Sequence, residues 1–117
     1  MDIFITNNSM FYDKYKDIYD IEYQEVDVRS LIVNIRDRVH QGYILKTHPL
    51  SGSIKPKETQ YKTVLMEKSQ GTDYDSLLLI ENAIITCDKF IDRNYFTEEI
   101  INDFKTIDLS LIESVIL

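Results

Sequence analysis

Hydrophobic residues recur along this chain at two spacings, and each spacing indicates one type of secondary structure. Short apolar or alternating runs predict strands at residues 2–6, 21–26, 43–45 and 63–67. Spacings of three and four predict helices at residues 9–17, 28–41, 74–93 and 97–104. Residues 108–117 favour a further helix, with a buried edge strand as the alternative.

The order of these elements predicts the fold. Strands and helices alternate, which is typical of a sheet built with crossover connections. We therefore expect one α/β domain over residues 1–117, with a small, mostly parallel sheet of about four strands and helices packed on it. The fourth strand, at residues 63–67, is expected at an edge of that sheet.

Composition agrees with an ordinary folded domain, since 44% of the 117 residues are hydrophobic and 28% are charged. No run reaches the roughly 20 apolar residues that span a bilayer, and the first residues lack the pattern of a signal peptide. We therefore expect a cytoplasmic protein without a membrane partner. The single cysteine, Cys87, cannot form an internal disulfide, and two histidines are too few for a structural zinc site, so no cofactor or metal is predicted.

Charge is distributed unevenly along the chain. The net charge of −7 argues against nucleic-acid binding, because phosphate contacts need a basic surface. Residues 46–70 nevertheless carry five bases and two acids. Within them, residues 46–61 hold both prolines and no apolar pattern, and loops of this length in compact domains are usually functional or mobile.

Polar residues follow the first three predicted strands. Thr6-Asn7-Asn8-Ser9 follows the first strand, Asp27 the second and Thr47-His48 the third. Because parallel strands end at a common edge, where ligands bind, we expect these residues to converge there. The run after the first strand is then a cradle for an anion or, alternatively, a turn and helix cap.

The candidate ligand-binding residues supply amides, hydroxyls, an imidazole and ammonium groups. They are Thr6, Asn7, Asn8, Thr47, His48, Ser51, Gly52, Ser53, Lys55 and Lys57. Residues 51–53 resemble a fragment of a phosphate-binding loop but lack the rest of a Walker motif. His48 is also the candidate general acid or base, with a structural hydrogen bond that holds the loop as the alternative. Each lysine taken alone fits a solvated loop residue.

The long loop resembles a known family. Thr47-His48-Pro49-Leu50-Ser51-Gly52-Ser53-Ile54-Lys55-Pro56, followed by Glu58-Thr59 and Tyr61, is similar to the GrdX family. These are small proteins associated with the glycine, sarcosine and betaine reductase systems of anaerobic bacteria. Ile5-Thr6-Asn7-Asn8 and residues 107–112 also resemble this family, so the likeness covers almost the whole chain. The resemblance implies a cytoplasmic accessory role near an amino-acid reductase and assigns no activity to any residue.

Three functions follow as hypotheses. The first is a binding protein that holds a small anionic metabolite or a reductase subunit at the strand-end loops. The second is a small enzyme with His48 as general acid or base, although no convincing partner for His48 is visible in the sequence. The third is a docking or homodimer module that uses the acidic helices from Thr72 onward.

Overall fold

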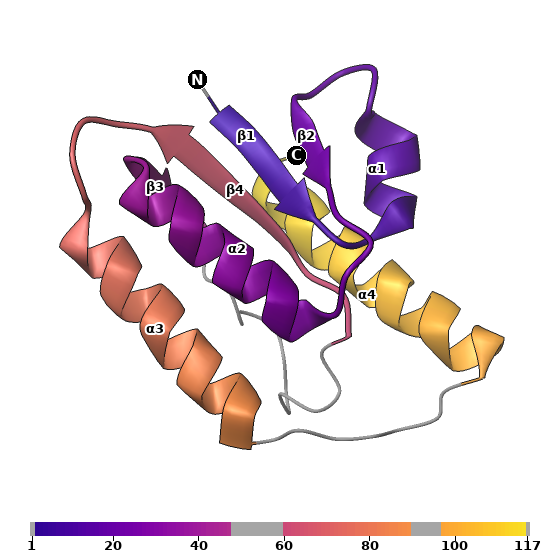
Figure 1. Cartoon of the computed structure of the whole chain (residues 1–117). Helices are drawn as coiled ribbons and strands as arrows, with labels where there is room; N and C mark the ends of the chain where they lie inside the picture. Colours follow the sequence, from indigo (N-terminus) through magenta and orange to yellow (C-terminus); the bar gives the residue numbers. More distant parts are fainter. Residues whose placement is uncertain (1, 48–59, 90–96, 117) are drawn as a thin grey trace.

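The computed structural model describes residues 2–47, 60–89 and 97–116 (Figure 1). The described strands are β1 (Asp2–Thr6), β2 (Ile21–Tyr23), β3 (Tyr43–Leu45) and β4 (Thr63–Lys68). The described helices are α1 (Ser9–Tyr15), α2 (Val28–His40), α3 (Tyr74–Lys89) and α4 (Glu98–Ile116). The α/β class is confirmed, and most elements lie close to their predicted places, although β2 ends at Tyr23 rather than at residue 26.

The strands form one sheet in the order β2-β1-β4-β3. The β1–β2 pair is parallel, whereas β4 runs antiparallel to both of its neighbours. The prediction of a mostly parallel sheet is therefore wrong, because the sheet is mixed. The expected edge position of the fourth strand is also wrong, since β4 lies between β1 and β3. Its first four residues, 63–66, are all buried, as a strand covered on both faces requires.

Helices cover both faces of the sheet. On one face α2 and α3 pack against the side chains of Ile5, Val64 and Met66. On the other face α1 and α4 pack against Phe4 and Leu65. In Figure 1, α2 and α3 lie in front of the sheet and α4 lies behind it. Alternating residues of β1 and β4 thus point into two separate hydrophobic clusters.

Local signals explain where α2 begins and ends. The Asp27 carboxylate caps its first turn by accepting the Ser30 N–H at 2.7 Å. Gly42, with φ of +98°, follows its last turn in the left-handed conformation that glycine adopts most easily. The helix therefore occupies almost the whole predicted range.

The C-terminal part of the chain forms one helix where two were predicted. Residues 98–116 are continuous in α4, and the Thr97 hydroxyl accepts the Ile100 N–H at its start. The preference for a helix over an edge strand at residues 108–117 is confirmed up to Ile116. Ile112 anchors this helix in the cluster around Phe4. Residues 90–93, the end of the helix predicted at residues 74–93, lie outside the described ranges.

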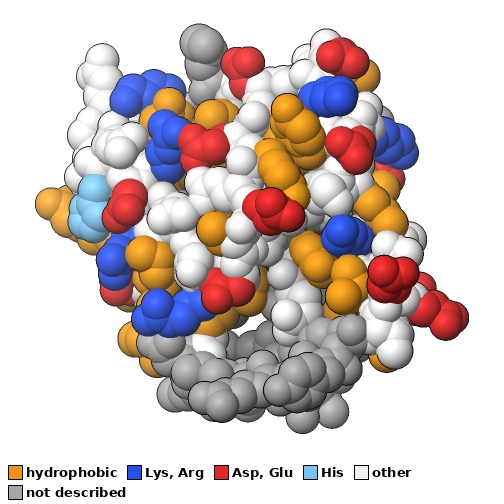
Figure 2. All heavy atoms as spheres, turned by 45° about the vertical axis from the view of Figure 1, so that its right-hand side comes forward, with side chains coloured by type: hydrophobic (Ala, Val, Ile, Leu, Met, Phe, Trp, Pro, Cys, Tyr) orange, Lys and Arg blue, Asp and Glu red, His pale blue; other side chains and the backbone are white. Residues whose placement is uncertain are grey.

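Side chains on the surface are mixed in type. On the face shown in Figure 2, Lys and Arg are interspersed with Asp and Glu, and hydrophobic side chains lie between them. Among the described helices, none has the length and apolar character needed to cross a membrane.

Candidate functional site

The carboxyl ends of β1, β2 and β3 point toward the same edge of the sheet. β1 and β2 are parallel, and β1 and β3 are both antiparallel to β4. The first and third strands therefore run in the same direction, as expected. Thr47, two residues after β3, accepts the Leu65 N–H with its hydroxyl oxygen at 3.1 Å. The chain that leaves β3 thus stays beside β4 on its way toward this edge.

A buried polar cluster lies where β1 ends. Its centre is Asp108 of α4, which is only 4% exposed. One carboxylate oxygen, Oδ1, accepts the Thr63 N–H at 3.1 Å. The other, Oδ2, accepts the Asn8 Nδ2–H at 2.9 Å and the Thr63 hydroxyl at 2.8 Å. These bonds attach α4 to the ends of β1 and β4.

The environment of Asp108 perturbs its titration. Burial raises the pKa of the carboxyl group, while the hydrogen bonds from Asn8 and Thr63 and the charge of Lys62 oppose that rise. Burial also lowers the pKa of the Lys62 ammonium, and the charge of Asp108 opposes this shift. The two groups therefore favour each other's charged form.

The paired asparagines make structural hydrogen bonds. Asn8 caps α1 by accepting the Met10 N–H, and its amide donates to the Lys105 carbonyl as well as to Asp108. Asn7 donates to the carbonyls of Val26 and Gln60 and accepts the Lys62 N–H. The alternative of a turn and helix cap therefore describes this segment well. Both N–H groups of each amide are used within the protein.

Thr6, the third candidate in this segment, is also bonded within the cluster. Its hydroxyl lies 2.7 Å from the Thr63 hydroxyl and 3.2 Å from the Lys62 carbonyl, and its oxygen accepts the Asn8 N–H. The structure thus brings Thr6, Asn7 and Asn8 together at the predicted edge. Their binding of a ligand stays a prediction.

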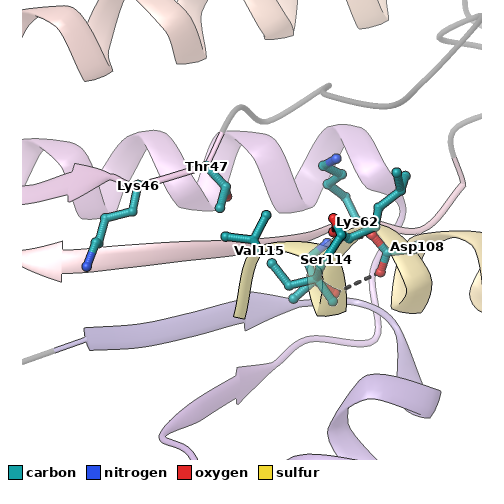
Figure 3. A pocket seen from close by; sticks show the side chains of 9 residues that line it. Lys46, Thr47, Lys62, Asp108, Ser114 and Val115 are labelled. Carbon is teal, nitrogen blue, oxygen red and sulfur yellow. Dashed lines mark hydrogen bonds between the residues drawn. The ribbon is translucent and has the colours of Figure 1, made fainter. Parts of the chain in front are cut away.

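A cleft opens between α4 and the two chain segments that flank residues 48–59. We call it the Lys62 cleft; its volume is about 170 Å³. Figure 3 shows its walls: Lys46 and Thr47 follow β3, Lys62 precedes β4, and Asp108, Ser114 and Val115 belong to α4. Lys46 points away from Asp108 and pairs with Asp2 at 3.2 Å, whereas Lys62 is only 5% exposed. The cleft is therefore lined by the Lys62 side chain, hydroxyl groups and the Asp108 carboxylate, while the Lys46 ammonium at its edge is directed toward Asp2.

A second pocket, of about 240 Å³, lies beyond the ends of β1 and β2. It brings together Asn7 and Asp27, which were predicted to converge, with four polar residues that are not among the candidate ligand-binding residues: Tyr23, Glu25, Tyr61 and Lys105. We call it the switch-point pocket.

Several candidate residues cannot be placed. His48, Ser51, Gly52, Ser53, Lys55 and Lys57 all lie outside the described residues. Their proposed roles, including that of His48 as general acid or base, stay predictions. In the described ranges no group of three or more His, Cys, Asp or Glu side chains could hold a metal ion. Cys87 is buried in the cluster between α2 and α3, as a small apolar side chain would be.

Asp108 and Lys62 were missed by sequence reasoning, although each carried a signal. Asp108 lies four residues before the buried Ile112, so it is an acid on the apolar face of a helix. Lys62 directly precedes the buried run 63–66. A charged residue within such a pattern is unusual, because burying a charge requires partners. The partner of Asp108, however, is Asn8, one hundred residues away.

Comparison with known proteins gives one match. The sequence model of the GrdX family, described as GrdX-like protein, matches residues 3–117. No curated protein and no solved structure matches this chain. The match includes both segments that form the Lys62 cleft and the whole of α4.

Proposed function

The chain belongs to the GrdX-like protein family, and from this we propose that it is an accessory protein of glycine reductase metabolism that binds a small anionic ligand in the Lys62 cleft. The observation on which the proposal rests is a lysine that is 5% exposed and borders an open cleft. Burial lowers the pKa of the Lys62 ammonium, the charge of Asp108 opposes this shift, and a bound anion would stabilise the charged form further.

The hydrogen-bonding groups of the cleft support an anion. The two oxygens of Asp108 already accept three hydrogen bonds from the protein. The Thr47 oxygen accepts the Leu65 N–H, and among the residues that the structure describes its hydroxyl proton has no acceptor, so it can be donated to a ligand. The Lys62 ammonium and the Thr47 hydroxyl are then the donors that border the cleft, and donor groups suit a carboxylate or a phosphate.

The size of the cleft limits the ligand. The cleft is open and small, with a volume of about 170 Å³. Such a space favours a small anion such as phosphate, acetate or acetyl phosphate over a whole nucleotide. The ligand is therefore a small metabolite or the acidic end of a larger one.

Thermal unfolding with added anions tests the ligand site. Phosphate or acetyl phosphate should raise the melting temperature at constant ionic strength, and ATP should do so less. A ligand at 100 times its Kd stabilises the folded state by about 2.7 kcal/mol. Lys62→Met, which keeps the length of the side chain and removes its charge, should weaken the effect about tenfold.

Lys16→Met provides a matched control, because Lys16 is exposed and follows α1, away from the cleft. It should leave the anion effect unchanged. If no anion shifts the melting temperature while a purified reductase subunit binds the protein, the ligand site is wrong and the accessory role depends on protein docking. Replacing the chromosomal copy by Lys62→Met and measuring glycine reductase activity in extracts then tests the accessory role itself.

A further inference from the structure

The switch-point pocket lies at the position where open α/β sheets bind ligands. After β1 the chain enters α1 on one face of the sheet, and after β2 it enters α2 on the opposite face. Two neighbouring parallel strands whose connections leave in opposite directions open a crevice at their carboxyl ends. The pocket, of about 240 Å³, occupies this crevice.

Its charged groups come from different elements. Lys105 belongs to α4, and its ammonium lies 3.0 Å from the Ser9 hydroxyl oxygen and 5.2 Å from the centre of the Tyr61 ring. The carboxylates belong to Glu25 and Asp27 in the connection that leads to α2. Because α4 and α2 pack on opposite faces of the sheet, the positive and negative groups approach the pocket from opposite sides.

Several polar groups of the pocket have hydrogen-bonding capacity left. Within the part of the chain that the structure describes, neither the Tyr23 nor the Tyr61 hydroxyl makes a hydrogen bond, and the Glu25 carboxylate forms no ion pair. Burial raises the pKa of both phenols, so they remain neutral donors at physiological pH. The tyrosine ring faces also attract an ammonium group.

We propose that the switch-point pocket binds a small zwitterion of the amino-acid type, with its ammonium toward Glu25 and Asp27 and its carboxylate toward Lys105. The two carboxylates disfavour a simple anion, and the Lys105 ammonium disfavours a simple cation. The volume fits an amino acid with a small side chain. This inference is independent of the anion site, because Lys105 and Tyr61 line only the switch-point pocket among the clefts described here, and Lys62 lines only the other.

Three probes of similar size separate the possibilities: glycine, acetate and methylammonium. The first carries both charges, and each of the others lacks one of them. Backbone amide NMR shifts should change around residues 23–27 and Lys105 on addition of glycine, with the weaker probes requiring concentrations about tenfold higher. Glu25→Gln and Lys105→Met should each weaken glycine binding about tenfold. Since Glu25 is exposed, its variant retains the fold.

Lys16→Met should leave the response to glycine unchanged. The proposal is overturned if methylammonium binds as tightly as glycine, which makes the pocket a cation site, or if acetate does, which makes it an anion site. It is also overturned if glycine causes no shifts in this region, or if Lys62→Met alone abolishes them and places glycine in the Lys62 cleft. A failure of phosphate to bind has no bearing on these results.

Discussion

The Asp108 carboxylate joins parts of the chain that lie far apart in sequence. Its partners are Asn8, one hundred residues earlier, and Thr63, forty-five residues earlier. A buried carboxylate is tolerated only where hydrogen bonds replace the water that it loses. The stability of this end of the molecule therefore depends on a few polar side chains.

Asn8→Ala should lower the free energy of unfolding by about 3 kcal/mol. The change removes the cap of α1, worth about 1 kcal/mol, together with the hydrogen bonds from the Asn8 amide to the Lys105 carbonyl and to Asp108. These two bonds contribute about 1 kcal/mol each, the one to the carboxylate somewhat more, although Asp108 keeps its bonds from Thr63. Urea denaturation measures the loss.

Asn8→Ser separates these contributions, because its hydroxyl oxygen still accepts the Met10 N–H and only the amide donors are lost. It should be less damaging than Asn8→Ala by about 1 kcal/mol. Asn102→Ala, an exposed change on α4, serves as the background and should stay within about 0.5 kcal/mol of the natural protein. A loss below about 1 kcal/mol for Asn8→Ala contradicts the role given to the cluster.

The pH dependence of stability should carry opposite signs at two carboxyl groups. Because burial raises the folded-state pKa of Asp108, the folded protein binds this proton more tightly than the unfolded chain. The contribution of Asp108 to stability therefore falls as pH rises from the ordinary carboxyl pKa through the raised one. Glu113 is the reverse case, since bonds from Lys14 and Tyr15 lower its pKa. Its contribution is present above its ordinary pKa and is lost as pH falls through the lowered one.

Urea denaturation across the acidic to neutral range checks both signs. The stability difference between the natural protein and Asp108→Asn should grow as pH falls, and the difference for Glu113→Gln should shrink. If the stability of each variant varied with pH just as the stability of the natural protein does, neither carboxyl group would have a different pKa in the folded and unfolded states.

At the scale of single elements, β4 shows what sequence patterns can and cannot provide. The existence of β4 follows from its apolar run, but its place in the sheet depends on pairing with β1, whose Thr6 lies opposite Thr63. Its four consecutive buried residues are typical of a strand covered on both faces, a signal that favours a central position. The edge of the sheet where polar residues gather was predictable, because it follows from the order of strands and helices along the chain. The hydrogen bonds that the Asn8 amide donates were not predictable, because their acceptors depend on where α4 packs.

The turn after α2 should be sensitive to a single added carbon atom. Gly42 has φ of +98°, and a Cβ atom there would lie 3.3 Å from the Ser69 carbonyl oxygen. Gly71 has φ of +71° with open space around it. Gly71→Ala should cost about 1 kcal/mol for the left-handed backbone alone, and Gly42→Ala about 2 kcal/mol because crowding adds to it. Equal losses in urea denaturation would mean that Ser69 moves aside freely.

At the scale of the whole molecule, the two hydrophobic clusters share one sheet. Phe4 and Ile5 are neighbours in β1 and belong to opposite clusters. If β1 leaves the sheet, both clusters are therefore exposed to water. Among the described residues most of the clustered aromatic rings lie on one side, where Phe11, Tyr15 and Tyr19 pack around Phe4, whereas only Tyr43 packs against the other cluster. Tyrosine fluorescence thus reports chiefly on this side, and the chain has no tryptophan.

Ile5→Ala should therefore destabilise the side that it does not touch. The cavity left among α2, α3 and the sheet should cost about 3 kcal/mol. Both tyrosine fluorescence and circular dichroism should show the same lowered midpoint in urea, as expected for one cooperative unit. A fluorescence transition that stays at its original midpoint would show that the two faces unfold separately.

The central position of β4 in the sheet also affects how the chain folds during synthesis. Thr6 and Thr63 are paired although they lie 57 positions apart, so β1 cannot gain its second neighbour until residues 63–68 have left the ribosome. During that time only the three-residue ladder with β2 is available to it, and two strands alone are marginal in water. During synthesis the edge of Ile3-Phe4-Ile5 therefore stays unpaired, and an exposed apolar strand edge favours association between incompletely folded chains.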